Sequence, residues 1–222
     1  MGMPTIILAS NSPRRRQLLA WTGWTFQISP VDIDETPYPG EAPDIYVSRL
    51  ARAKAEARTK HSHPECLVLA ADTIVADGQV LLGKPEGPDE AVDMLRRLKG
   101  RSHQVYTAIH LISTGDGRST ADRCCANVPM RAYTEDEIAA YVESGDPLDK
   151  AGAYAIQHAG FHPVEDFHGC YACVVGLPLC HLVRSMARLG FSPVHDVPTA
   201  CQANLNYSCP VYKAVLRGED VG

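Results

Sequence analysis

Several short polar segments of this chain could bind a phosphorylated ligand, and the first lies near the N-terminus. It runs from Ser10 to Arg15 (Ser-Asn-Ser-Pro-Arg-Arg), between an apolar run and a predicted helix. A helix start offers unpaired N–H groups and the positive end of the helix dipole, so two arginines there are unfavourable unless an anion binds. Arginine also makes two-pronged contacts with phosphate oxygens. The segment indicates either an anion site or a solvated basic helix start.

Carboxylates suited to a divalent cation or to activating water occur at two places. Asp72 follows the apolar run 66–71, and open α/β sheets place catalytic groups at the carboxyl ends of central strands. Asp32, Asp34 and Glu35 lie together in an acidic, proline-rich loop, and clustered carboxylates suit a hard cation such as Mg²⁺. The alternative for Asp72 is an aspartate that only stabilises a turn, and the alternative for the loop is a solvent-exposed acidic segment without a cation.

Two further segments carry groups that suit a nucleotide. Lys84 stands between Gly83 and Pro85 after a predicted hairpin, where it either reaches a phosphate or is solvated. The run from Asp149 to Gln157 is rich in small residues, which let a backbone approach a ligand closely. A buried Gln157 amide would both donate and accept hydrogen bonds, matching the imide edge of uracil or thymine. A plain mobile loop is the alternative for this run.

Strands and helices that must position these residues alternate along the chain. Apolar runs predict strands at 6–9, 25–29, 66–71, 102–113, 119–133 and 171–175, and a hairpin at 74–82. Helical patterns begin at Pro13 (capped by Ser12), at Asp44, at Pro88, after a capping box of Thr134 with Glu137, and at Pro178. This alternation predicts an α/β fold in which Asp72 ends a buried strand, and the chain becomes irregular beyond Pro193.

Net charge, apolar runs and cysteine content indicate which classes of protein this chain does not resemble. A net charge of −5 over 222 residues argues against a general nucleic-acid binder. We find neither a signal peptide nor an apolar run long enough to span a membrane, so a cytoplasmic protein without membrane partners is expected. Most of the eight cysteines are expected to be free thiols. A zinc site of Cys170, Cys173, Cys201 and Cys209 is the alternative. A strand at 171–175 argues against it, because alternating side chains would direct Cys170 and Cys173 to opposite faces of the strand.

Taken together, these segments resemble the Maf family of nucleotide pyrophosphatases, in family order and spacing from about Thr5 to Gly190. The matching stretches are Ile7–Arg15, Arg49–Ala55, Ala71–Thr73, Gly83–Pro85, Gly100–Thr107, Asp149–Tyr154 and Val175–Pro178. The resemblance implies an α/β fold with a mixed central sheet, flanking helices and two lobes around a cleft, as in inosine triphosphate pyrophosphatases, with a homodimer as a possible assembly. We therefore expect a Maf-like domain over residues 1–193 and an irregular C-terminal extension over residues 194–222.

The resemblance also implies a reaction, the hydrolysis of a nucleoside triphosphate to its monophosphate and pyrophosphate with Mg²⁺ or Mn²⁺. By position, Asp72 and Glu35 match catalytic residues and candidate metal ligands, and Asp72 is the family's proposed general base. The matching substrate-binding positions are Ser10, Arg14, Arg15, Lys54, Thr73, Lys84 and Gln157. Sequence does not decide whether Asp72 acts as base or as ligand.

The run 149–157 resembles the subgroup that acts on dTTP and UTP, whereas the sibling subgroup acting on 7-methyl-GTP has a different sequence there that lacks the Tyr-x-Ile-Gln pattern. Two residues depart from the family pattern, because His158 stands where glycine is usual and Cys170 where serine is usual. The first departure bears on the preferred base more than on the reaction. The same reaction on another or modified nucleotide, and a non-catalytic nucleotide-binding regulator of cell division, remain the alternatives.

Overall fold

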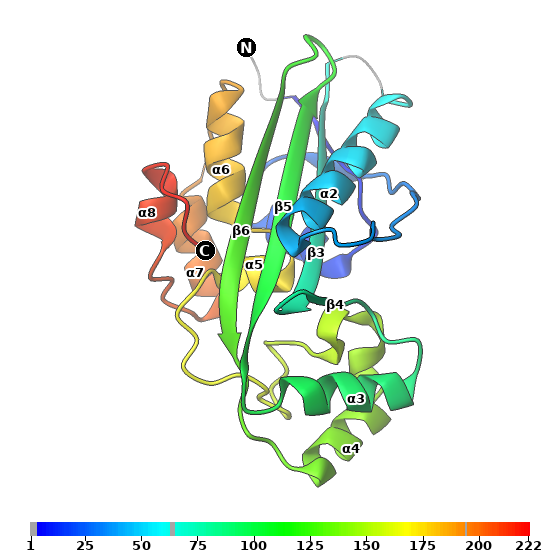
Figure 1. The fold of residues 1–222 in the computed structure, drawn as a ribbon. Helices are drawn as coiled ribbons and strands as arrows, with labels where there is room; N and C mark the ends of the chain where they lie inside the picture. The colour runs from blue at the N-terminus through cyan, green and yellow to red at the C-terminus, as the bar shows by residue number, and fades with distance from the viewer. Residues whose placement is uncertain (1–3, 63–64, 194) are drawn as a thin grey trace.

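A mixed six-stranded sheet forms the centre of the computed structural model, which describes residues 4–62, 65–193 and 195–222 (Figure 1). Its strand order is β2-β1-β3-β5-β6, and short β4 pairs with β3. The strands are β1 (Ile6–Leu8), β2 (Phe26–Ile28), β3 (Leu67–Asp77), β4 (Val80–Leu82), β5 (Ser102–Ser113) and β6 (Ser119–Pro129). β1 is parallel to β2 and β3, and the other pairs are antiparallel. The predicted α/β fold with a mixed sheet is confirmed.

Helices cover both faces of this sheet. On one face lies α2 (Pro43–Thr59), and on the other lie α1 (Pro13–Ala20), α5 (Tyr171–Val175) and α6 (Leu179–Arg188). Two later helices, α7 (Val197–Leu205) and α8 (Tyr212–Leu216), pack against α6 (orange to red in Figure 1). Within the described ranges, no helix is both long and apolar enough to cross a membrane.

A second lobe lies at the far end of the long strands, at the bottom of Figure 1. It contains α3 (Pro88–Leu98), α4 (Glu135–Glu143) and two short 3-10 turns, Asp146–Asp149 and Ala151–Ala153. Its apolar core is distinct from the one beneath α1, α5 and α6, and includes Leu95, Tyr133 and Phe161. The molecule therefore has two lobes that share β3 and β5.

The central strand β3 extends further than its apolar run predicts. β5 pairs with it from Leu67 to Ala76, so Asp72 lies inside a continuous strand. The prediction that Asp72 ends a strand is wrong, because ladder hydrogen bonds come from the backbone and tolerate a polar side chain whose own partner is supplied elsewhere. Side chains of β3 alternate, so that Val68 and Ala70 pack in a core cluster with Ala55 of α2 while Leu69 and Ala71 face α1 and α5.

Within the described residues, one edge of β3 has no neighbouring strand over the stretch that contains Asp72 and Thr73. β1 pairs with β3 only as far as Leu69, and β4 begins its pairing at Val75. Between them, residues 70–74 have no strand neighbour on that side in the described part of the sheet. Polar groups carried by β3 are therefore accessible at this point although the strand is central.

Local sequence signals explain the helix starts that were predicted. The Ser12 side chain accepts a hydrogen bond from the backbone N–H of Arg15, and Pro13 opens α1. Thr134 and Glu137 form the expected capping box at the start of α4. Both features satisfy backbone donors that a helix start leaves unpaired.

Two predictions of secondary structure are wrong. Residues 171–175 form helix α5 instead of a strand, since a short run that is apolar on all sides fits a buried helix equally well. The segment beyond Pro193 is not irregular, because it contains α7 and α8. The Asp196 carboxylate caps α7 by accepting from the Thr199 N–H, and Pro198 lies in its first turn. That cap signal was present in the sequence.

Candidate active site

A cleft of about 650 Å³ opens between the two lobes, beside the gap along β3. That volume lies within the range typical of small-molecule sites. The upper lobe contributes the loop and helix start from Ala9 to Arg15, and the lower lobe contributes residues around Lys150. Most of the expected site residues line it, namely Ser10, Arg14, Arg15, Glu35, Lys54, Thr73 and Lys84.

Asp72 does not itself line the cleft, but it is joined through Lys54 to Glu35, and both of these residues do line it. The Nζ atom of Lys54, on α2, lies 2.6 Å from Oδ1 of Asp72 and 2.6 Å from Oε1 of Glu35. Asp72 faces α2 because it shares the strand face of Val68 and Ala70. The Asp72 and Lys54 side chains are 9% and 11% exposed, whereas that of Glu35 is 54% exposed. One ammonium thus bridges a buried carboxylate and a carboxylate near solvent.

The environment of Asp72 makes its carboxyl a stronger base than usual. Burial raises the pKa of Asp72 above its ordinary value, and the positive charges of Lys54 and Arg15 oppose this rise. The negative charge of Glu35 raises the pKa further. Since general-base efficiency improves as the pKa approaches the working pH, Asp72 is suited to accept a proton from water.

Arg15 is held by neutral acceptors alone. Its Nε donates to the Gly176 carbonyl at 3.0 Å, Nη2 to Thr73 Oγ1 at 3.1 Å, and Nη1 to Ser10 Oγ at 3.4 Å. Burial lowers the pKa of Arg15, but a guanidinium remains charged in proteins. Arg15 is therefore a positioned, desolvated cation at the start of α1.

Three cations facing the cleft lack a counter-ion. Within the described residues, no carboxylate lies within 4.0 Å of the charged groups of Arg14, Arg15 or Lys84, although Lys54 and Lys150 each have two. The start of α1 also contains no acidic residue in its first turn. Such an arrangement favours a ligand that carries several negative charges.

The carboxylates fit a hard divalent cation that a phosphate ligand helps to bind. Asp72 and Glu35 each use one oxygen on Lys54, and their second oxygens carry no hydrogen bond from the described residues. Mg²⁺ is usually bound by one or two carboxylates, with the remaining positions filled by substrate phosphates and water. Two carboxylates beside a phosphate-binding helix start match that donor set.

The other predicted acidic residues do not join the site. Asp34 accepts a hydrogen bond from the Thr36 N–H at 2.9 Å and stabilises a turn of its own loop. Neither Asp32 nor Asp34 lines the cleft. Glu35 is the carboxylate of this loop that lines the cleft, and Tyr46 fixes its backbone by donating to the Glu35 carbonyl at 2.9 Å.

Gln157 occupies a different environment from the one expected. Its side chain is exposed and does not line the cleft, so the prediction of a buried amide is wrong, although its neighbour Ile156 does line the cleft. The small residues before it turn the backbone through a left-handed step, which leaves Gln157 at the surface. A contact between Gln157 and the base stays a prediction.

Sequence reasoning missed Lys150 as a cleft residue. Its ammonium is buried and contacts Asp149 Oδ1 at 2.6 Å and Asp146 Oδ1 at 3.0 Å. Tyr154, which also lines the cleft, shares a 2.8 Å hydrogen bond with His103 of β5. The signal for Lys150 was a lysine inside a run of small residues with carboxylates one and four positions before it.

Gly152 joins the lower lobe to the sheet at close range. Its N–H donates to the Gly83 carbonyl at 3.0 Å, its φ is +68°, and an added Cβ would lie 2.9 Å from a methyl of Val75. Only glycine fits this contact without strain.

We expect Gly152→Ala to lower the free energy of unfolding more than Gly145→Ala does. Both positions have positive φ, at a cost of about 1–2 kcal/mol for alanine. At Gly145 an added Cβ meets nothing within 4 Å, whereas at Gly152 overpacking against Val75 adds about 1–3 kcal/mol. Urea unfolding of the two variants measures the difference, and equal losses would contradict the steric argument.

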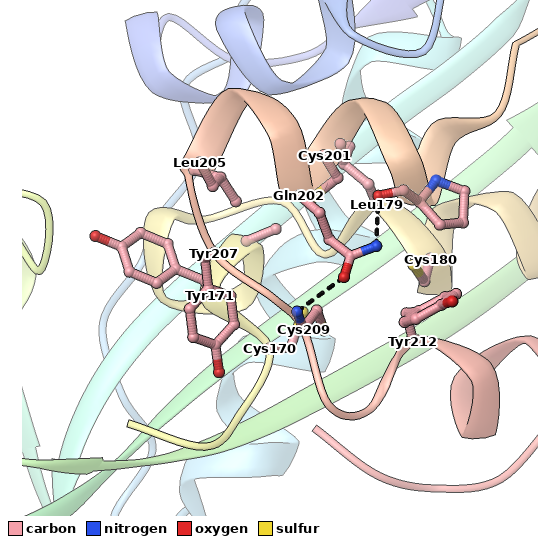
Figure 2. Close-up of a pocket in the computed structure, with 12 residues that line it drawn as sticks. Cys170, Tyr171, Leu179, Cys180, Cys201, Gln202, Leu205, Tyr207, Cys209 and Tyr212 are labelled. Atoms are coloured by element: carbon pink, nitrogen blue, oxygen red, sulfur yellow. Dashed lines mark hydrogen bonds between the residues drawn. The ribbon is translucent and has the colours of Figure 1, made fainter. Parts of the chain in front are cut away.

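The eight cysteines are all unbridged in the structure. Figure 2 shows four of them, Cys170, Cys180, Cys201 and Cys209, around a small apolar cavity of about 10 Å³ between α5, α6 and α7, with room for about one water molecule. Cys173 does not line this cavity, because its thiol donates to the carbonyls of Val105 and Cys124. The four-thiolate zinc alternative is therefore not assembled among the described residues.

Comparison with known proteins identifies the family. Residues 5–189 match the family model described as Maf-like protein. The chain belongs to the Maf family. All seven stretches that carried the resemblance contribute at least one residue to the lining of the cleft, although they are scattered between residues 7 and 178. The Maf motifs of this chain therefore converge on one site.

Two curated relatives cover most of the chain. The dTTP/UTP pyrophosphatase of Dehalococcoides mccartyi is 46% identical over 196 residues, which are 88% of this chain and 87% of the relative. The dTTP/UTP pyrophosphatase of Myxococcus xanthus is 48% identical over 185 residues, 83% of this chain and 92% of the relative. Among solved structures, the Staphylococcus aureus Ham1 protein matches 58% of this chain and 72% of its own with a TM-score of 0.43 and 15% identity, a likeness too loose to bear on the site.

Proposed function

We propose that this Maf-family chain is an enzyme that hydrolyses dTTP and UTP to the nucleoside monophosphate and pyrophosphate. The observation that carries the proposal is that three cations without counter-ions line one cleft, in which Lys54 also binds the buried carboxylate of Asp72 behind it. The names of the relatives, dTTP/UTP pyrophosphatase, support the substrate class. A nucleotide-binding regulator would have no use for a buried carboxylate with a raised pKa.

In the proposed reaction, Asp72 takes a proton from a water molecule as its oxygen attacks the α-phosphorus. The bond from the α-phosphorus to the oxygen that bridges it to the β-phosphorus breaks, and pyrophosphate leaves with that oxygen. Lys54 holds Asp72 and Glu35 in place, and its positive charge lowers the pKa of Asp72 against the rise that burial causes. Positioned charge of this kind is usually the largest single contribution to rate in such sites.

The remaining site residues are proposed to hold the triphosphate. Arg15, fixed by Ser10, Thr73 and Gly176, and Arg14 beside it contact phosphate oxygens at the start of α1. Lys84 approaches from the other lobe, so the phosphate chain would span the cleft. Gln157, next to Ile156 at the cleft, is proposed to contact the base.

Glu35 would also hold a divalent cation, Mg²⁺ or Mn²⁺, through its free carboxylate oxygen. Asp72 would be a second ligand in the alternative in which it does not act as the base, because its one free oxygen cannot bind the cation and accept the proton together. When bound, the cation neutralises phosphate charge and polarises the phosphoryl group.

A panel of dTTP, UTP, CTP and GTP, each with Mg²⁺, tests the proposed function. We expect turnover fastest with dTTP and UTP, with one pyrophosphate released for each monophosphate and no orthophosphate. Chromatographic products of a diphosphate and orthophosphate would contradict attack at the α-phosphorus. Binding without turnover of any nucleotide would favour the regulator instead.

Chelation should abolish turnover reversibly. Glu35 lines a cleft that also carries three cations without counter-ions, and Asp72 is joined to it through Lys54. We therefore expect the divalent cation to bind together with the triphosphate. In excess EDTA we expect activity to fall to background, and added Mg²⁺ or Mn²⁺ should restore it. Undiminished turnover in EDTA would show that Lys54 and the arginines suffice without a metal.

A further inference from the structure

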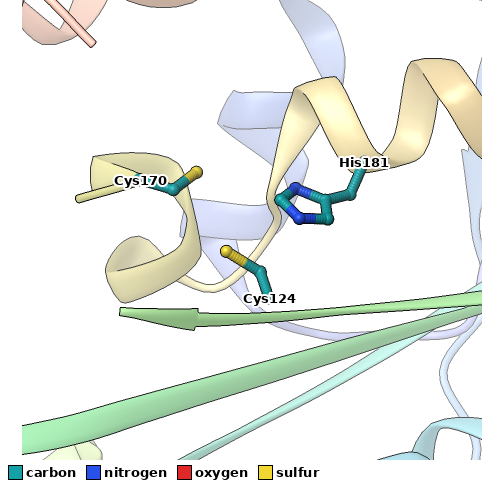
Figure 3. A group of neighbouring side chains, drawn as sticks. All are labelled: Cys124, Cys170 and His181. Atoms are coloured by element: carbon teal, nitrogen blue, oxygen red, sulfur yellow. The ribbon is translucent and has the colours of Figure 1, made fainter. Parts of the chain in front are cut away.

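Three buried side chains converge behind the active site, on the sheet face covered by α5 and α6 (Figure 3). Cys124 lies on β6, Cys170 directly precedes α5, and His181 lies on α6. Their sulfur and ring-nitrogen atoms all lie within 4.8 Å of one another. This is a different place from the cleft, since none of the three lines it.

His181 is the unusual member of this group. It is 0% exposed, and neither of its ring nitrogens has a hydrogen-bond partner among the described residues. The Val221 backbone faces the ring without reaching hydrogen-bond geometry, and the nearby Asp122 carboxylate is engaged by Arg184 at 2.6 Å. Buried polar groups almost always have partners, so an imidazole with two unpartnered nitrogens indicates that a ligand is missing.

The two thiols complete a donor set of recognisable type. Cys124 and Cys170 contact each other through their sulfurs and are almost completely buried. The neighbouring Cys173 thiol, by contrast, already donates to two backbone carbonyls. Two cysteine sulfurs and one imidazole nitrogen are ligands that zinc prefers, and tetrahedral zinc would hold them about 3.3–3.8 Å apart. The present separations of at most 4.8 Å exceed these values by no more than about 1.5 Å.

We propose that Cys124, Cys170 and His181 bind one zinc ion, separate from the divalent cation of the active site. The fourth tetrahedral position would fall to water or to an oxygen of residues 220–222, since Gly222 lies against the Cys124 sulfur. Soft sulfur ligands select zinc over Mg²⁺, which requires oxygen.

The proposed ion would brace the element that positions Arg15. Cys170 stands at the start of α5, and Gly176 at its end accepts the hydrogen bond from Arg15 Nε. With β6 and α6 tied to the residue that directly precedes α5, the ion would fix this short helix at one end while Arg15 contacts the other.

Metal analysis of the full chain tests the site. The protein is kept reduced, stripped with a chelator, reloaded with Zn²⁺ and passed over a desalting column in excess Mg²⁺. We expect about one Zn²⁺ to remain bound per chain. Co²⁺ in place of Zn²⁺ should give thiolate-to-cobalt charge-transfer absorption and the visible bands of a tetrahedral ion, both removed by Zn²⁺. No retained zinc and no such absorption in the parent protein would overturn the proposal.

Matched variants locate the ion. Cys124→Ser, Cys170→Ser and His181→Gln should each lose the charge-transfer band or the retained zinc. Cys173→Ser, within α5 but outside the group, should keep both, and so should Cys209→Ser. Circular dichroism checks that each variant is folded. If a variant does not fold, the zinc and cobalt measurements on the parent protein still test the proposal. Loss of the signal in Cys173→Ser and Cys209→Ser, with retention in His181→Gln, would overturn the assignment in favour of four thiolates. Asp72→Asn should retain zinc, and its loss there would mean that the ion occupies the active site.

Discussion

Replacing Asp72 by asparagine is expected to abolish turnover while leaving the protein folded. The substitution keeps the size and shape of the side chain and removes its charge, and with it a proton acceptor or a metal ligand. Loss of a general base alone typically lowers the rate by a factor of about 10² to 10⁴. Substrate binding should persist in part, because Arg14, Arg15 and Lys84 are unchanged.

The stability of this variant separates catalysis from folding. Burial raises the pKa of Asp72 above its unfolded value, so its contribution to stability is most favourable below the unfolded pKa and declines as pH rises through the folded pKa. Near neutral pH the ionised group therefore costs stability, and Asp72→Asn should not lower the thermal midpoint. Lys54 keeps Glu35 as a partner.

The measurement is kcat/KM for dTTP with Mg²⁺, with Asp34→Asn as the matched control. Asp34 is exposed, lies outside the cleft and makes a turn contact that asparagine can also make. The control should retain parental activity. If Asp72→Asn stays within about tenfold of the parent, below the range for loss of a general base, Asp72 is not the base.

Those parts of the fold that depend only on neighbouring residues could be predicted from the sequence. Alternating strand and helix patterns gave the α/β class, and the caps at Ser12 and Thr134 were correct because such caps depend only on residues within one turn. Helix α5 was missed because five apolar residues contain no periodicity that separates a helix from a strand. Its helical state is imposed by burial between α1 and β5.

The membership of the site was more predictable than its geometry. Residue types and the family resemblance selected Asp72, Lys54 and Glu35. That the Lys54 ammonium contacts both carboxylates depends on how α2 packs against the sheet, which the sequence around these residues does not encode. The gap between β1 and β4 that exposes the middle of β3 is a property of the sheet, and no local pattern at Asp72 encodes it. The group of Cys124, Cys170 and His181 was likewise invisible, because its members come from three elements far apart in sequence.

Lys54→Met should destabilise the protein and suppress turnover together. Methionine matches the length of the lysine stem, but it leaves the Asp72 carboxylate buried beside Glu35 without a bridging cation. Breaking one side of a buried ion pair typically costs about 3–5 kcal/mol. Because the Lys54 charge lowers the pKa of Asp72, its loss raises that pKa further, so the acidic limb of the kcat/KM profile should move to higher pH.

A second lysine in the same cleft provides the control. Lys150 is as buried as Lys54 and also contacts two carboxylates, but Asp146 and Asp149 are 33% and 77% exposed, against 9% for Asp72. Lys150→Met therefore leaves two solvated carboxylates, and we expect a smaller loss of stability than in Lys54→Met.

The double variant Lys54→Met/Asp72→Asn shows what causes the loss of stability in Lys54→Met. If the cost is an uncompensated buried carboxylate, removing that charge should recover most of the lost free energy of unfolding without recovering any turnover. Urea unfolding of the parent, both single variants and the double variant yields the coupling between the two side chains. Additive losses would mean that Lys54 stabilises the fold by packing alone. An unchanged pH profile in Lys54→Met would separate Lys54 from the ionisation of Asp72.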